Sequence, residues 1–181
     1  MEMTSKSKTK GSSWERDIVK DFSRIFNSSF LRTPSSGAFL GKSNKVRKEI
    51  LHDGQIRIMK GDIIPPDNWK YFNCEAKNYA DFPFHQLIQD ECKQLETWLS
   101  QLMDVSDPDD LNILIFKITR KGKYVAVQNN IDWDHSSPYI YYKSSTHNDW
   151  KIFDYDNFLE YNASLIEYIS TLGITGYIHL K

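Results

Sequence analysis

Cysteine is scarce in this sequence, and long apolar runs are absent. Cys74 and Cys92 are the two cysteines among 181 residues, and they show neither CxxC spacing nor the pattern of a disulfide framework. No apolar run approaches the roughly 18 residues that a membrane span requires. The first residues, MEMTSKSKTKGSS, contain no apolar core of a signal peptide. We therefore expect a soluble, intracellular protein with no membrane partner.

Motifs for nucleotide and zinc chemistry are missing as well. No GxxxxGK[ST] loop occurs, so we expect no nucleotide cofactor. The histidines show neither HxxxH nor His/Cys spacing, and surface or capping roles are the simpler interpretation for them. They are His52, His85, His135, His147 and His179.

The charge is unevenly distributed, although the formal net charge is only -1. Residues 1–60 contain 13 Lys and Arg against 6 Asp and Glu, whereas residues 61–181 contain 10 against 18. A basic first third indicates a polyanionic partner such as nucleic acid, and a solvated charged face is the alternative. The basic stretch between residues 42 and 60 looks like a loop that contacts DNA through Lys42, Lys45, Arg47 and Lys48.

The pattern of apolar residues and turns predicts a mixed α/β domain over residues 12–181, preceded by a flexible basic arm over residues 1–11. A hydrophobic fraction of 40% is sufficient for one domain with a real core. The expected elements are a helix opened by a Ser12-x-x-Glu15 capping box, a short strand at 30–32, a strand near 56–59, strands over 60–64 and 71–77, one long helix from Asp81, strands over 111–118, 123–128 and 139–142, and a helix near 156–172.

Three acidic residues and a lysine stand out against this framework. Side chains alternate across a strand, so Glu75 and Lys77 share one face, about 7 Å apart. Asp62, across the preceding turn, can approach that face, and two carboxylates there would suit a divalent ion such as Mg²⁺. Glu15 falls within the apolar stripe of the first helix, where a carboxylate is costly unless something binds it or pairs with it. A salt bridge at Lys77 and a capping box at Glu15 are the structural alternatives.

Four separated motifs, taken in order, resemble those of the archaeal-type Holliday junction resolvases, which belong to the PD-(D/E)xK nuclease superfamily. The motifs are Glu15-Arg16, Arg32-Thr33-Pro34-Ser35-Ser36-Gly37, Gly61-Asp62 and Glu75-Ala76-Lys77. The resemblance covers residues 12–128, and residues 129–181 form an extension without a counterpart. Gly61 stands where the family usually has proline, and the segment between Gly37 and Gly61 is longer than in the compact archaeal forms.

This resemblance implies a restriction-endonuclease-like fold, in which helices flank a mixed central sheet. It further implies that Glu15, Asp62 and Glu75 are the acidic residues of a Mg²⁺ site, with Mn²⁺ as a plausible substitute, that the Ala76 carbonyl is a further ligand and that Lys77 is the catalytic lysine. By the same resemblance, Arg16, Arg32 and Ser36 contact DNA near the scissile phosphate.

The function implied is cleavage of branched DNA by a homodimer in the cytoplasm of a bacterial cell or phage-infected host. Two alternatives remain open. One is another nuclease of the superfamily, such as a nicking, repair or restriction-like enzyme. The other is a non-catalytic nucleic-acid-binding module, which the three carboxylates disfavour because they would weaken plain phosphate binding.

Overall fold

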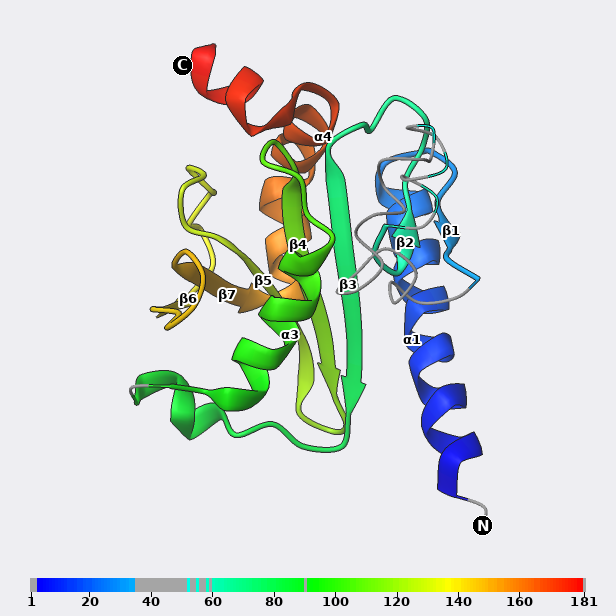
Figure 1. Ribbon diagram of the computed structural model, residues 1–181, viewed down its shortest axis with the longest axis vertical. Helices are drawn as coiled ribbons and strands as arrows, with labels where there is room; N and C mark the ends of the chain where they lie inside the picture. The colour runs from blue at the N-terminus through cyan, green and yellow to red at the C-terminus, as the bar shows by residue number, and fades with distance from the viewer. Residues whose placement is uncertain are drawn as a thin grey trace.

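The computed structural model describes residues 3–34, 52, 55, 58, 60–89 and 91–180, and the side chains from residue 11 onward (Figure 1). Several of the positions discussed above lie outside these residues. They are Ser36, Lys42, Lys45, Arg47, Lys48 and residues 56, 57 and 59 of the strand expected near 56–59, whereas the described Ile58 is helical and not in a strand.

Helices separate two runs of consecutive strands along the chain. Their order is α1 (Met3–Ile25), β1 (Leu31–Arg32), β2 (Ile63–Ile64), β3 (Phe72–Tyr79), the short 3-10 helix η2 (Phe84–Ile88), α3 (Lys93–Asp104), β4 (Leu111–Ile118), β5 (Gly122–Gln128), β6 (Tyr139–Tyr142), β7 (Trp150–Asp154) and α4 (Tyr155–His179).

A five-stranded mixed sheet in the order β3-β4-β5-β7-β6 forms the centre of the molecule. β3 and β4 run parallel and are joined through η2 and α3, whereas the other neighbouring strands pair antiparallel. β1 and β2 pair with each other as a separate ribbon beside β3. The prediction of a mixed central sheet flanked by helices, as in restriction endonucleases, is confirmed.

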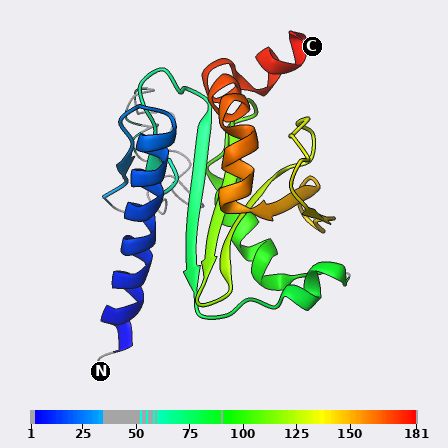
Figure 2. The ribbon, with the colours of Figure 1, turned by 180° about the vertical axis from the view of Figure 1, so that it is seen from behind.

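Helices cover both faces of this sheet (Figures 1 and 2). On one face, α1 and α4 bury an aromatic-rich cluster that includes Trp14, Phe22 and Phe158. On the other face, α3 buries a second cluster that includes Trp98 and Phe116. Full burial of each such side chain stabilises the fold by about 1.5–3 kcal/mol, so the sheet between the two clusters is a rigid support.

The first helix begins earlier than the sequence suggested. α1 starts at Met3, so Ser12 and Glu15 lie inside the helix and form no capping box, and residues 3–11, expected as a flexible arm, are helical. Apolar periodicity reports only the buried part of a helix. Once the buried turns exist, adding polar residues with good helix propensity, such as lysine, needs no new nucleation.

The long helix expected from Asp81 is two shorter elements, η2 and α3. Cys92, between them, has an extended backbone, and its N–H donates to the phenol oxygen of Tyr142 at 3.1 Å. Because this donor bonds to a side chain from a distant strand, it forms no helical hydrogen bond there. The interruption therefore depends on a tertiary contact that the local sequence does not reveal.

The C-terminal part contains one strand that the sequence did not predict and a longer helix than expected. β7 lies between β5 and β6, and Lys151, its second residue, interrupts the apolar run. The Lys151 ammonium lies 2.8 Å from a ring nitrogen of His135, so the lysine is buried with a polar partner. α4 continues to His179 through a kink at Gly173, whose φ is +79°.

Across the described ranges, no helix is both long and apolar enough to cross a membrane.

Candidate active site

Asp62 is held against the outer edge of β3 by its own backbone and side chain. Its N–H donates to the Cys74 carbonyl at 2.8 Å, and its Oδ2 accepts from the Ala76 N–H at 2.8 Å. Its carbonyl accepts from the Thr33 N–H at 2.9 Å. Asp62 is only 3% exposed, so the carboxylate is fixed beside the strand that carries Glu75.

Gly61 makes this close approach possible. Its φ is +66°, a left-handed conformation that residues with a Cβ rarely adopt. A Cβ at this position would lie 2.5 Å from the Cys74 carbonyl oxygen. Glycine is therefore required for the chain to turn and to bring Asp62 onto β3.

Glu75 and Lys77 point to the same side of β3, as strand alternation predicts. The Lys77 Nζ lies 2.6 Å from Glu75 Oε1 and 2.5 Å from Oε1 of Gln101 on α3. The side chains of Lys77 and Glu75 are 14% and 12% exposed, so the ion pair is largely shielded from water. The ammonium thus bridges the strand to the helix that covers it.

Glu15 reaches the site region from α1. Its Oε2 accepts from Arg32 Nη1 at 3.0 Å, which links α1 to β1. This pairing explains how a carboxylate is tolerated within the apolar stripe of α1, because the guanidinium compensates for the lost hydration.

The pKa of Asp62 depends on both nearby glutamates. Burial, followed by repulsion from Glu75, raises the pKa of Asp62 to about 7. The Ala76 N–H opposes this rise, Glu15 adds to it, and Lys77 opposes it. Asp62 therefore lies in a field of negative charge that a bound cation would relieve.

The donor set has the chemistry that a hard divalent cation prefers. Carboxylate oxygens of Asp62 and Glu75 are such ligands. The N–H and C=O of one residue project to the same side of a strand, so the Ala76 carbonyl lies on the edge that faces Asp62. No three acidic, His or Cys side chains among the described residues form a ready-made metal cluster. Two of the carboxylates are instead paired with Arg32 and Lys77.

The other predicted DNA contact within the described residues is Arg16. It is exposed on α1, and its guanidinium donates to Ser12 Oγ of the same helix at 3.5 Å.

Three residues close to the site were not identified from the sequence. Gln101 contacts Lys77 from an exposed position on α3. Lys60 belongs to the basic stretch expected to bind DNA, but it is 5% exposed and paired with Asp110. Asn73, on β3, is fully buried. No sequence pattern marks these residues, because their partners are distant in the chain.

Comparison with known proteins gives one match. A family described as "Phage putative PDDEXK endonuclease" matches residues 6–168 of the chain. Neither the curated proteins nor the solved structures contain a significant match.

Proposed function

The chain belongs to this phage PDDEXK endonuclease family, and we propose that it is a Mg²⁺-dependent enzyme that resolves four-way DNA junctions as a homodimer. Membership of the family makes it an endonuclease of the PD-(D/E)xK superfamily, whose members typically use divalent metals. The choice of Mg²⁺, the junction substrate and the dimer are the proposal.

The observation that carries the proposal is the position of Asp62 on the edge of the strand that bears Glu75 and Lys77. The Ala76 N–H bond to Asp62 fixes one carboxylate next to the other, and the pKa of Asp62 is raised by burial and by Glu75. A structural salt bridge alone would explain Lys77 and Glu75, but it would not explain a second, buried carboxylate beside them.

In this proposal, Asp62, Glu75 and the Ala76 carbonyl would hold the ion, with Glu15 as a further acidic group. A divalent ion in such a site lowers the pKa of a bound water and neutralises charge on the phosphate. Lys77 would donate hydrogen bonds to the oxygens on which charge develops. Its second contact, with Gln101, orients the ammonium without neutralising it. Arg32, which pairs with Glu15, would bind a phosphate oxygen.

The junction substrate is supported by the resemblance of four ordered motifs to the archaeal-type resolvases. A four-way junction has two-fold symmetry, and its resolution requires nicks in two opposed strands. The described residues contain one set of Asp62, Glu75 and Lys77, so two cuts require two chains in a two-fold arrangement. A candidate contact is β6 at the free edge of the sheet, where Tyr139, Ile140 and Tyr141 are exposed.

A substrate panel tests this function. The purified chain is incubated with a labelled four-way junction, a matched duplex, a flap and a single strand, each with Mg²⁺ or with EDTA. We expect paired, symmetric cuts in the junction with Mg²⁺ and none with EDTA, and a dimer by light scattering. A strict monomer, or nicks in one strand only, would contradict the resolvase assignment and favour a nicking enzyme of the same superfamily.

A further inference from the structure

Lys60 is a buried lysine that lies two residues before Asp62. Its ammonium pairs with the Asp110 carboxylate and lies 2.8 Å from Asp107 Oδ2. The Lys60 side chain is 6% exposed and the Asp110 side chain 1%. Two charges in such a position are costly to desolvate, so this pair is weak evidence for stability alone.

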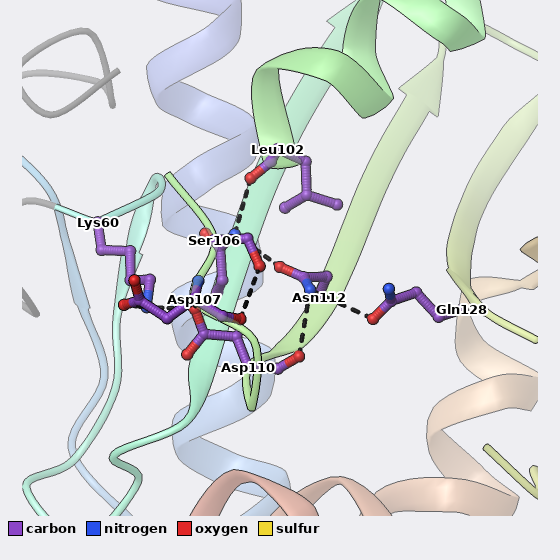
Figure 3. A network of polar contacts seen from close by, with 8 residues as sticks. Lys60, Leu102, Ser106, Asp107, Asp110, Asn112 and Gln128 are labelled. Atoms are coloured by element: carbon purple, nitrogen blue, oxygen red, sulfur yellow. Dashed lines mark hydrogen bonds and ion pairs between the residues drawn. The ribbon is translucent and has the colours of Figure 1, made fainter. Parts of the chain in front are cut away.

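A chain of polar contacts extends from this pair into the sheet (Figure 3). The Asp110 carboxylate also accepts from the Asp107 N–H at 2.6 Å, and the Asp110 carbonyl accepts from Asn112 Nδ2 at 3.1 Å. Asn112 lies at the centre of this series of contacts. Its Nδ2 donates to Gln128 Oε1 at 3.2 Å, and its Oδ1 accepts from Asn73 Nδ2 at 2.8 Å.

Asn73 gives this network its second point of contact with the candidate active site. It lies two residues before Glu75 on the same face of β3, and its Nδ2 also donates to the Leu102 carbonyl at 2.8 Å. Lys60 and Asn73 therefore hold the residues that lead into Asp62 and Glu75, respectively. Lys60 is tied to the loop between α3 and β4, and Asn73 to the last turns of α3.

We propose that the network of Lys60, Asp110, Asn112 and Asn73 positions Asp62 and Glu75 for binding a divalent ion, with Lys60 as a positioning residue. This inference rests on the proposed function. Gly61, with positive φ, connects Lys60 directly to Asp62, so a shift of the Lys60 backbone is transmitted to the carboxylate. A metal site requires its oxygens at fixed separations, and partners that orient ligands typically change metal affinity by about 10–100-fold.

The test must separate positioning from simple stabilisation. Lys60→Met alone would leave Asp110 buried without a counter-charge, so the variant is the pair Lys60→Met with Asp110→Asn, which removes both charges. The matched control is Glu96→Gln. Glu96 is a buried carboxylate that accepts from Tyr142, Ser144 and Thr146, and this cluster shares no residue with the candidate site.

The measurement is the shift in melting temperature of the full chain as Mg²⁺ or Ca²⁺ is added without DNA, so it does not depend on turnover. We expect the double variant to need at least about 10-fold more metal than wild type for the same shift. Glu96→Gln should lower the starting melting temperature but need the same metal concentration as wild type.

The outcomes separate the two claims. If wild type responds to metal and the double variant responds at the same concentration, the positioning role is wrong while the proposed function stands. If wild type shows no response to either ion, the proposed metal site itself fails. Should the double variant not fold, Asn112→Ser decides the question, because it leaves the Lys60–Asp110 pair in place and removes the contacts of the Asn112 amide with Asn73 and with the Asp110 carbonyl. An unchanged metal requirement in that variant overturns the proposal.

Discussion

The ammonium of Lys77 lies 2.6 Å from the carboxylate of Glu75, and both side chains are largely buried beneath α3. A second carboxylate, Asp62, lies beside this pair, and its pKa is raised by burial and by Glu75. This relationship leads to predictions that distinguish a catalytic centre from a structural ion pair.

Replacing Lys77 with methionine keeps the packing of the side-chain stem and removes the charge. We expect cleavage to fall by about 100- to 1,000-fold, because an ammonium at the reacting phosphate is lost. Stability should fall by about 1–3 kcal/mol, since the pair is partly desolvated. Single-turnover cleavage is compared with the exposed control Lys143→Met at a temperature where circular dichroism shows both variants folded. If Lys77→Met cleaves DNA at the wild-type rate, Lys77 has only a structural role.

Replacing Asp62 with asparagine should stabilise the metal-free protein at neutral and alkaline pH. The folded-state pKa of Asp62 is about 7, above its ordinary value. Folding therefore favours the protonated form of Asp62. The free energy of unfolding is not reduced by this carboxyl below its pKa in the unfolded chain, and it falls as the pH rises through about 7. In EDTA at about pH 8, Asp62→Asn should be more stable than wild type by about 2–4 kcal/mol, with the difference closing toward about pH 4.

Urea denaturation across this pH range measures the effect of Asp62. Glu160→Gln, at an exposed position on α4, is the control and should show no such difference. An Asp62→Asn protein that is less stable than wild type in alkaline EDTA would indicate that the carboxylate is a structural group.

Replacing Gly61 with alanine should damage the site through the backbone. The new Cβ would meet the Cys74 carbonyl oxygen, and the φ of +66° would be strained, at a cost of about 1–3 kcal/mol. Relief of this clash moves Asp62 away from Ala76, so cleavage should fall as well. Gly11→Ala is the control, because a Cβ there meets nothing within 4 Å and the residue is helical. Equal stability of the Gly61 and Gly11 variants would contradict this account of the turn.

The basic segment ahead of Gly61 should contribute DNA affinity and no chemistry. Lys45→Ala, Arg47→Ala and Lys48→Ala, combined, should weaken binding to all DNA forms. The slope of log affinity against log salt should become shallower by about 0.9 for each duplex phosphate that the protein no longer neutralises. Fluorescence anisotropy at several salt concentrations measures this slope, with Lys70→Ala as the single-charge control. A triple variant with an unchanged slope would show that this segment does not touch DNA.

Much of the candidate site could be predicted because its geometry is local. The period of two in a strand places Glu75 beside Lys77, and the turn before β3 brings Asp62 to the same edge. Leu111–Ile118 was predicted with its observed bounds, because a strand buried on both faces is a continuous apolar run.

Other features depend on contacts between residues that are distant in the chain. Tyr142 interrupts the helix at Cys92, and His135 accommodates Lys151 inside β7. Lys60 resembles its basic neighbours in the sequence, but it forms an ion pair with Asp110 and is buried beside the candidate site. Such pairings have no local signal, since each residue is ordinary in its own segment.

The most direct test of the catalytic centre is single-turnover cleavage of labelled junction DNA by wild type, Asp62→Asn and Glu75→Gln with Mg²⁺, with binding measured in parallel in EDTA. The account predicts that both variants lose at least about 1,000-fold in cleavage rate, because they lose a metal ligand, while their affinity for the junction is retained or increased. Cleavage at the wild-type rate by either variant would show that Asp62 and Glu75 do not form the catalytic metal site.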